Sequence, residues 1–279
     1  MKDLSGKVAM VTGGGSGIGR ATALALAARG TVVAVADLDE GTAKETAAAV
    51  TAGGGRASAH QADVTSEGRM RALVDEVLAE HGVVDVVVNN AGIAPPPTRA
   101  VDIDLDAFRR IVDVNLWGMV YGSLFFLPHL LTRPEANLVN VASNAGIVGY
   151  SRMATYSTSK FAIRGFTESL RMELRRTPVK LTVVCPGATR TAIMENSPLI
   201  SEAQRRQLQT AWNGAVGVRP PAAVGEAIVK AVLKDRPRCL VGPDTVLLDV
   251  LARLLPGGHS RLLGPGIDLA LTKMLGTKG

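Results

Sequence analysis

The 279-residue sequence predicts a single α/β domain, with a doubly wound parallel sheet that carries helices on both faces. Two observations predict this fold. Short apolar runs of strand length recur along the chain, and longer stretches with helical spacing separate them. A hydrophobic content of 47%, with no compositional break, is enough for one substantial core.

The expected elements alternate in a regular order. The apolar runs lie at 8–11, 32–36, 84–88, 138–141 and 181–185. The stretches with helical spacing lie at 18–29, 39–51, 66–81 and 154–176. Local signals mark several boundaries: Gly30 after the first helix, Asp63 to Ser66 before the third, and Gly187 after a strand that stops at Pro186. Because parallel strands need crossover helices, this order predicts one parallel sheet covered on both faces.

A glycine-rich turn joins the first expected strand to the first expected helix, in the order Thr12-Gly13-Gly14-Gly15-Ser16-Gly17-Ile18-Gly19. Its spacing is T-G-x-x-x-G-x-G and not the G-x-G-x-x-G of the usual dinucleotide fingerprint. Glycines permit close backbone approach, and the helix N-terminus offers free N–H groups and a positive dipole end. We therefore expect a Rossmann-like dinucleotide site, with the pyrophosphate against Gly13, Gly15, Ser16, Gly17, Ile18 and Gly19.

Asp37 ends the second apolar run, 18 residues after Gly19. A carboxylate at this place can accept hydrogen bonds from the adenosine ribose and repels a phosphate on that ribose. The next residues, Leu38 and Asp39, include no cation for a 2′-phosphate, so the sequence favours NAD(H) over NADP(H). Alternatively, Asp37 caps a helix that begins near Asp39 or Glu40.

Tyr156 and Lys160 stand four residues apart in a stretch with helical spacing, and Ser143 lies 13 positions upstream of Tyr156. The i,i+4 spacing puts the phenol and the ammonium on one face of a helix. We expect the cation to stabilise the phenolate and to lower the pKa of Tyr156 toward the working pH. Tyr156 would then act as a general acid or base.

With these motifs, residues 5 to 242 resemble the short-chain dehydrogenase/reductase family in its compact single-domain form. Further matching motifs are Asn89-Asn90-Ala91-Gly92 after the run at 84–88, Asn115 in the next helix, and Pro186-Gly187 followed by Thr189 and Thr191. All of them stand in the order that the family shows. Their joint occurrence is more specific than any one of them, since Tyr-x-x-x-Lys alone is a common string.

The resemblance implies an NAD(H)-dependent enzyme that interconverts a secondary alcohol and a ketone. Tyr156 would give a proton to the carbonyl, or take one from the alcohol, while the nicotinamide exchanges hydride. Lys160 would bind the nicotinamide ribose and favour the phenolate. Ser143 would hydrogen-bond the substrate oxygen, and Asn115 would hold a water that links Lys160 to solvent.

The resemblance also implies further cofactor contacts. They come in addition to the glycine turn, Asp37, Tyr156 and Lys160. Leu38, Asp63 and Val64 would lie near the adenine, and Asn90, Ala91 and Gly92 along the adenosine. The remaining contacts would be Pro186, Gly187, Thr189 and Thr191, with Thr191 at the nicotinamide carboxamide. Structural alternatives stay open for three residues: Ser143 as a turn residue at a strand end, Asn115 as a helix kink and Thr191 as a helix cap.

Two segments point to the substrate. Residues 188–218 leave a strand end and mix polar with aliphatic side chains, which predicts a substrate lid on a catalytic domain at 1–242, or else an ordinary surface excursion. The lid composition favours a mostly apolar small molecule, while Arg152 and Arg190 leave an acidic or thioester-linked substrate open.

Residues 243–279 carry leucines at helical spacing, so we expect a helical extension packed on the same domain. It could cover the pocket, contact another subunit or lie on a membrane surface.

Composition limits the partners. The net charge is +6, but the basic region from 201 onward has almost no aromatic residues, so we expect no nucleic acid. Cys185 and Cys239 form no CxxC or Cys/His cluster, so we expect neither a disulfide nor a metal.

No signal peptide is visible, which favours a cytoplasmic location. The uncharged stretch 114–132 contains Asn115 and Pro128, which favours a buried or interface helix over a membrane span. From the resemblance we expect a homotetramer or homodimer.

Two other functions compete with the dehydrogenase. A fold of this type could retain NAD as a redox-sensing ligand and act through a protein partner. Such a sensor is expected to lose Tyr156, Lys160 or Ser143, and all three are present. An epimerase or dehydratase could use the same four residues, and it would form its product with no net change in NADH.

Overall fold

A computed structural model describes residues 1–190, 193, 197–202, 205–206 and 218–266. Its seven strands form one sheet in the order β3-β2-β1-β4-β5-β6-β7, and every neighbouring pair is parallel. The strands are β1 (Val8–Thr12), β2 (Val32–Asp37), β3 (Arg56–Gln61), β4 (Val86–Asn89), β5 (Ala136–Val141), β6 (Val179–Pro186) and β7 (Arg238–Val241). The predicted fold class is therefore confirmed.

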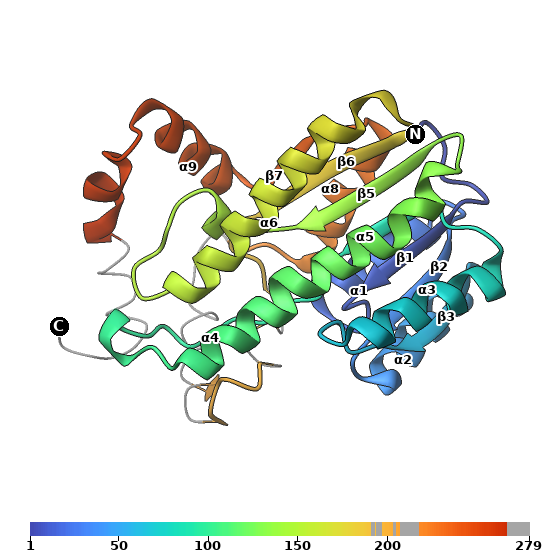
Figure 1. Ribbon diagram of the computed structural model, residues 1–279, viewed down its shortest axis with the longest axis horizontal. Helices are drawn as coiled ribbons and strands as arrows, with labels where there is room; N and C mark the ends of the chain where they lie inside the picture. Colours follow the sequence, from blue (N-terminus) through green and yellow to red (C-terminus); the bar gives the residue numbers. More distant parts are fainter. Residues whose placement is uncertain (191–192, 194–196, 203–204, 207–217, 267–279) are drawn as a thin grey trace.

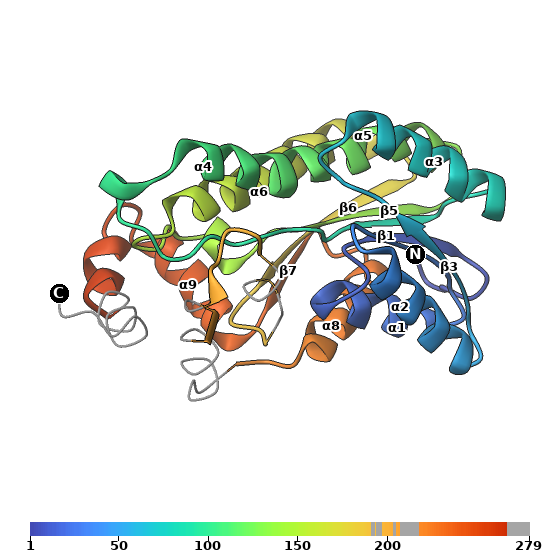
Figure 2. The ribbon, with the colours of Figure 1, turned by 90° about the horizontal axis from the view of Figure 1, so that it is seen from below.

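Helices cover both faces of the sheet (Figures 1 and 2). One layer holds α1 (Gly17–Ala27), α2 (Glu40–Ala52) and α8 (Pro221–Leu233). The opposite layer holds α3 (Glu67–His81), α4 (Leu105–Val112), α5 (Gly118–Leu131) and α6 (Ala154–Glu173). The strand order reverses between β1 and β4, so the helices that follow them leave toward opposite faces. A ligand crevice is expected at the carboxyl ends of these two strands.

Two strands have no counterpart among the apolar runs of the sequence. β3 has the sequence RASAHQ, and only its alternate residues Ser58 and His60 are buried, because it lies at the edge of the sheet. β7 is only four residues long and begins with Arg238. Neither segment offers a continuous apolar stretch, and propensity at an edge is decided by neighbours in the fold.

The predicted helix at 114–132 is part of a longer one. α4 continues through a π-helical turn, Asp113–Trp117, into α5. The inner side of α5 is buried on the sheet through Met119, Phe126 and Leu130. Of the described residues, only this continuous helix, Leu105–Leu131, is long and apolar enough to cross a membrane, by length and composition alone. Its buried side is that of a core helix.

The buried residue Asp85 joins the amino ends of three strands, through its carboxylate and its backbone carbonyl. Asp85 precedes β4 and is 1% exposed; its Oδ2 accepts from the Val8 N–H (2.9 Å), and its Oδ1 accepts from Arg133 Nε (2.8 Å). The Asp85 carbonyl accepts from Asn137 N–H of β5 (2.9 Å). The carboxylate thus connects β1, β4 and the chain that leaves α5.

We expect Arg133→Met to lower the free energy of unfolding by about 3 kcal/mol, because it leaves the Asp85 carboxylate buried without its cation. The Arg133 side chain is 27% exposed, which places the effect at the lower end of the range for buried pairs. Urea denaturation measures it. As a control, Lys44→Met removes an exposed i,i+4 pair with Glu40 and should cost no more than about 0.5 kcal/mol. Equal losses in the two variants would contradict the role of the buried pair.

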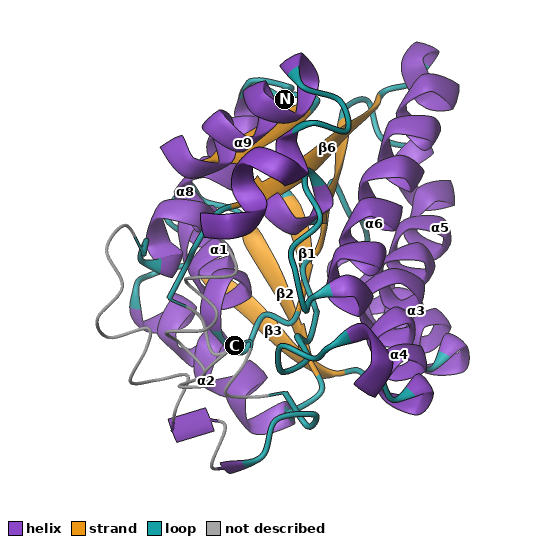
Figure 3. Cartoon of the chain, turned by 90° about the vertical axis from the view of Figure 1, so that its left-hand side faces the viewer, coloured by secondary structure: helices purple, strands orange, loops and turns teal. Residues whose placement is uncertain are grey.

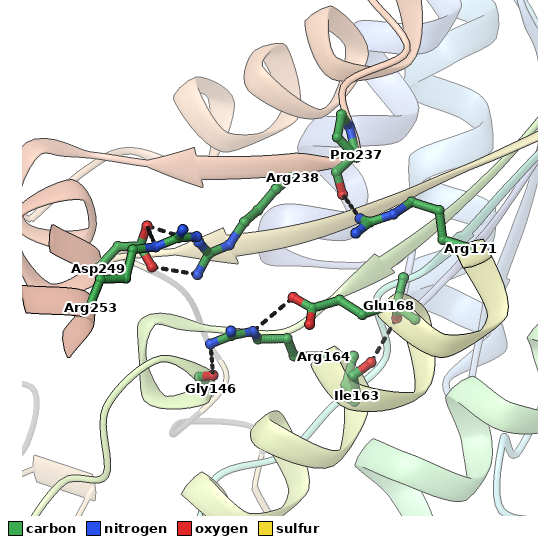
Figure 4. Close-up of polar contacts among 10 residues, drawn as sticks. Gly146, Ile163, Arg164, Glu168, Arg171, Pro237, Arg238, Asp249 and Arg253 are labelled. Atoms are coloured by element: carbon green, nitrogen blue, oxygen red, sulfur yellow. Dashed lines mark hydrogen bonds and ion pairs between the residues drawn. The ribbon is translucent and has the colours of Figure 1, made fainter. Parts of the chain in front are cut away.

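The C-terminal part is attached to β7 by an ion pair (Figure 4). α9 (Pro243–Leu254) follows β7, and its Asp249 pairs with Arg238 through both oxygens, at 2.6 and 2.8 Å. Arg253 donates to the same carboxylate at 3.1 Å. Burial alone would raise the pKa of Asp249, but the hydrogen bonds and charges of the two arginines lower it below its usual value.

Residues beyond α9 continue as a helix at 259–266, drawn in red in Figure 1. Leu248, Ala252 and Leu263 of this C-terminal part pack on a buried cluster that includes Ile147 and Cys185. The rest of the predicted extension, 267–279, lies outside the described residues.

Candidate active site

The glycine-rich turn connects β1 to α1 in a shape that other residues would not allow. Gly13 has a φ of +62°, in the left-handed region that favours glycine. A Cβ on Gly19 would overlap the carbonyl oxygen of Gly13 and would lie 2.5 Å from Asn90 Nδ2. The start of α1 therefore packs directly on the backbone of the turn, which leaves the N-terminal N–H groups of the helix accessible from the crevice.

Asn90 holds this turn in place from the end of β4. Its side-chain Nδ2 donates to the carbonyl oxygens of Thr12 (3.0 Å) and Gly13 (3.1 Å). Its backbone N–H donates to the Thr12 hydroxyl at 3.0 Å. The resemblance implies that Asn90 lies along the adenosine; in the structure its side chain also holds the glycine turn by hydrogen bonds.

Asp37 lies at the carboxyl end of β2, where it faces the turn. Its Oδ2 accepts from the Gly15 N–H at 2.8 Å, and its Oδ1 accepts from the Asp39 N–H at 3.2 Å. The residue that caps α2 is Asp39, whose Oδ1 accepts from the N–H groups of Gly41 and Thr42. The alternative that Asp37 caps the helix is therefore wrong.

A cavity of about 540 Å³ opens at the carboxyl ends of the strands. Eleven of the predicted cofactor residues line it: Gly13, Ser16, Gly17, Ile18, Asp37, Leu38, Asp63, Val64, Asn90, Ala91 and Gly92. Gly15 and Gly19 lie in the same turn but are not in the lining. The cavity therefore brings together residues from four separate loops.

Nine residues that were not predicted as cofactor contacts also line the cavity. They are Asp39, Thr42, Ala62, Ile93, Arg110, Val114, Ile193, Pro198 and Arg205. Ala62, Ile93 and Val114 are each adjacent in sequence to a predicted site residue, so proximity in the chain could have indicated them. Arg110 and Arg205 come from distant segments and carry no local signal. The predicted lid 188–218 lies largely outside the described residues, although Ile193, Pro198 and Arg205 belong to it.

Tyr156 and Lys160 lie in the first turns of α6. Lys160 is 2% exposed; its ammonium donates to the Val141 carbonyl at 3.3 Å and lies 5.5 Å from the centre of the Tyr156 ring. Ser143 follows β5, where its hydroxyl donates to Asn144 Oδ1 and accepts from the Ala145 N–H, both at 3.1 Å. Ser143 is thus a turn residue, as one alternative held, and its hydroxyl also lies beside that of Tyr156.

Burial controls the ionisation of this pair. It raises the pKa of Tyr156 to about 12, against a smaller lowering by the hydrogen bond of Ser143. It also lowers the pKa of Lys160 to about 8. The pKa of the phenol is thus shifted in the opposite direction to the one expected from Lys160, because the loss of solvent disfavours both charged forms. At neutral pH the phenol is protonated and can serve as a proton donor.

Asn115 lies in the π-helical turn and is fully buried. Its Oδ1 accepts from the Ile93 N–H (2.8 Å), and its Nδ2 donates to the Ile93 carbonyl and to Ser159 Oγ, both at 3.0 Å. A Cβ on Gly92 would lie 3.2 Å from Asn115 Oδ1 and 3.4 Å from Lys160 Nζ. The amide and the ammonium therefore converge on the same glycine. Asn115 does occupy an irregular turn of the helix, as the kink alternative proposed.

The predicted residues after β6 lie near the start of α9. The Ala188 N–H donates to Asp244 Oδ2 at 3.2 Å, and a Cβ on Gly187 would overlap that carboxylate. The backbone of Thr189 forms an isolated parallel β-bridge with that of Arg219, and the Arg219 side chain forms an ion pair with Asp244 at 2.7 Å. Pro186, Gly187 and Thr189 are not in the cavity lining. Thr191 lies outside the described residues.

Comparisons with known proteins agree with this architecture. A sequence family described as short chain dehydrogenase matches residues 7–199. "Putative oxidoreductase SadH" of Mycobacterium tuberculosis is 35% identical over 272 residues, which cover 96% of this chain and 97% of that protein. Cis-4-hydroxycyclohexanecarboxylate dehydrogenase of Sinomonas cyclohexanicum is 35% identical over 222 residues, covering 80% of this chain and 87% of that protein.

A solved structure has the same fold over most of its length. It is a crystal structure of a short chain dehydrogenase/reductase from Burkholderia phymatum in complex with NAD. It matches with a TM-score of 0.83 and 30% sequence identity, and the match covers 91% of this chain and 95% of that one. With the family match over more than half of its length, this chain belongs to the short-chain dehydrogenase/reductase family and is an oxidoreductase.

Proposed function

We propose that this protein interconverts a secondary alcohol and a ketone on a mostly apolar small molecule, with NAD(H) as the hydride carrier. The observation that carries the proposal is the meeting of Tyr156, Ser143 and Lys160 at the carboxyl edge of the sheet that also forms the cavity with Asp37. A phenol, a hydroxyl and an ammonium in this arrangement suit proton transfer to and from an oxygen atom.

The cavity fits a dinucleotide on three counts. The missing Cβ of Gly19 allows α1 to begin directly behind the turn, so its N–H groups are available to a pyrophosphate. Asp37 lines the cavity and can accept from ribose hydroxyls. The NAD complex of the Burkholderia phymatum relative supports the same choice. When bound, a nicotinamide ring would supply or accept the hydride.

The side chains have distinct proposed roles in ketone reduction. Tyr156, protonated at neutral pH, donates its proton to the carbonyl oxygen, and Ser143 donates a hydrogen bond to the same oxygen. Lys160 stabilises the phenolate that remains. Asn115 Oδ1 uses one lone pair on the Ile93 N–H, so it has capacity to accept from one relay water beside Lys160. In the oxidation direction the phenolate takes the proton of the alcohol.

An apolar, cyclic substrate is supported by one of the relatives. The Sinomonas cyclohexanicum relative is named for an alicyclic hydroxy acid. Arg152, in the loop that joins Ser143 to α6, stands four residues before Tyr156 and could meet a carboxylate on such a ring.

The test is a turnover assay with NADH and NADPH on ketones and secondary alcohols of increasing apolar size. Cyclohexanone and 4-oxocyclohexanecarboxylate form a matched pair that isolates the effect of a carboxylate. NADH turnover that rises with apolar size supports the proposal. Turnover with NADPH alone would refute the cofactor assignment, and a product formed with no net change in NADH would indicate an epimerase or dehydratase.

Asp37→Asn should raise the ratio of kcat/KM for NADPH to that for NADH by about tenfold or more. The amide keeps an acceptor for the Gly15 N–H but removes a negative charge that repels a 2′-phosphate, an interaction of about 1–4 kcal/mol at 4 Å. Steady-state kinetics with both cofactors measures the ratio. Asp106→Asn, on the exposed start of α4, is the control and should leave the ratio unchanged. An unchanged ratio in Asp37→Asn would place the discrimination elsewhere.

We also propose a homodimer or homotetramer. The helices α5 and α6 lie side by side in Figures 1 and 3. Their outer sides, with the π-helical turn before α5, expose the large apolar side chains Trp117, Leu124, Leu131, Phe161 and Met172. Apolar groups gathered in this way favour burial in an interface. Light scattering that gave a native mass near 29.1 kDa would refute the proposal.

The proposed location is the cytoplasm. Cys185 and Cys239 are both buried free thiols on neighbouring strands, and burial raises the pKa of both above its usual value. Such thiols are inert and suit a reducing compartment.

A further inference from the structure

A second cluster of chemically active side chains lies at the edge of the sheet, between β3 and the C-terminal half of α3. It contains His60 on β3, with Glu80 and His81 at the end of α3. One ring nitrogen from each histidine and one carboxylate oxygen of Glu80 lie within 4.8 Å of one another. The ligand spacing in the sequence predicted no metal, because the strand and the helix that bring these residues together are separated by the whole length of α3.

The two imidazoles converge on one point. His60 Nε2 and His81 Nε2 each lie 2.8 Å from the hydroxyl oxygen of Ser58. A serine hydroxyl has one proton, so in this network one imidazole accepts it and the other donates its own N–H. Glu80 approaches the same centre, with its Oε2 3.7 Å from His60 Nε2. A cation at this centre would replace the shared protons and take both ring lone pairs.

The orientation of His60 is fixed from the other side of its ring. Its Nδ1 lies 3.3 Å from Glu76 Oε2, and a carboxylate only accepts, so Nδ1 carries the proton and Nε2 presents its lone pair to the centre. Glu76 is held in turn by Arg69 at 2.8 Å, and Arg69 donates to the Gln61 carbonyl at 2.7 Å. A histidine that donates its second nitrogen to a carboxylate is the usual arrangement of a metal ligand, since the carboxylate fixes the tautomer.

Burial and charge also suit a small cation. His60 is 7% exposed, while the side chain of Glu80 is 52% exposed, so the centre is held from the inside and open to solvent on one side. The carboxylate of Glu76 neutralises Arg69, and Glu80 supplies the negative charge at the centre itself. Two imidazoles and a carboxylate are ligands that zinc accepts, with water or a hydroxyl in the remaining position.

We propose that His60, His81 and Glu80 bind one Zn²⁺ ion, with Ser58 or a water molecule as the fourth ligand and Glu76 as the residue that positions His60. The ion would join the edge strand β3 to α3. It is separate from the cavity and takes no part in the oxidoreductase reaction, so its effect is on stability and not on hydride transfer.

The experiment uses full-length protein without a histidine tag, treated with EDTA and then freed of chelator. Titration with Zn²⁺ against a chromophoric chelator should show one tight site per chain, and saturating Zn²⁺ should raise the melting temperature. His81→Gln and Glu80→Gln each remove a direct ligand, so each should weaken binding by more than about 100-fold and abolish the thermal shift. Glu76→Gln should weaken binding by about 10–100-fold, since it removes only the partner that orients His60.

The controls exploit the small number of histidines. The chain has four, so His129→Gln combined with His259→Gln removes both of those outside the cluster and should leave Zn²⁺ binding unchanged. Circular dichroism checks that each variant is folded, and the exposed Glu80 and Glu76 provide variants that do not disturb the core. Wild-type protein that binds no Zn²⁺, or that binds it equally well after His81→Gln, would overturn the proposal.

Discussion

Tyr156→Phe is expected to lower kcat by about 10²–10⁴-fold while leaving the affinity for NADH nearly unchanged. The substitution removes a single hydroxyl, the group proposed to exchange the proton with the substrate oxygen. The ring stays in place in the first turns of α6, and the cavity lining does not include it. Steady-state turnover gives kcat, and quenching of protein fluorescence by NADH gives the affinity.

Tyr121→Phe is the matched control for that experiment. Tyr121 lies on α5, where its ring stacks on Phe125 with centroids 5.5 Å apart, away from Ser143 and Lys160. Loss of this hydroxyl should leave kcat close to the wild-type value. If Tyr156→Phe kept the full function of the wild-type protein, the protein would act as a nucleotide-binding sensor and not as a dehydrogenase.

The sequence predicted the central sheet because its strands are buried on both sides. β1, β2 and β4 are mostly continuous apolar runs, and β5 and β6 are apolar runs interrupted by polar residues, as expected for parallel strands covered by helices on both faces. β3 and β7 lie at or near the two edges, where one side is less covered and the apolar signal weakens. Their existence follows from the packing of the whole sheet and not from local composition.

The site was predictable wherever a motif is local. The glycine turn, Asp37 and the Tyr156–Lys160 pair each depend on residues a few positions apart. The assignment of the helix cap to Asp39 depended on a backbone geometry that two neighbouring aspartates leave ambiguous in the sequence. Arg110 and Arg205 reach the cavity from distant segments, which only the fold brings together.

The ionisation of Tyr156 and Lys160 was the least predictable property. Spacing alone indicated that Lys160 would lower the pKa of Tyr156. Burial of both groups is a property of the packed protein, and it acts in the opposite direction on the phenol. The same burial brings the pKa of Lys160 to about 8, within reach of an activity measurement.

Lys160→Met is expected to lower kcat/KM for NADH in ketone reduction by about 10²–10³-fold, because it removes the charge that stabilises the phenolate. In the wild-type protein Lys160 is protonated below its pKa of about 8 and loses its charge above it. The wild-type kcat/KM for NADH should therefore fall as the pH rises through about 8. This parameter is the appropriate one, since it reports the ionisation of the free enzyme.

Lys160→Met has no ammonium to deprotonate, so its residual kcat/KM for NADH should not fall near pH 8. Lys160→Arg keeps the positive charge at every pH, so its kcat/KM should also show no fall near pH 8. Its rate should be higher than that of Lys160→Met, because the charge is retained. Lys180→Met, at an exposed position of β6, should retain the wild-type profile. A fall near pH 8 that persisted in Lys160→Met would belong to another group. The only kinetic evidence for the electrostatic role of Lys160 would then be the lower rate of Lys160→Met. The ionisation of this buried ammonium would not be visible in the pH dependence of kcat/KM.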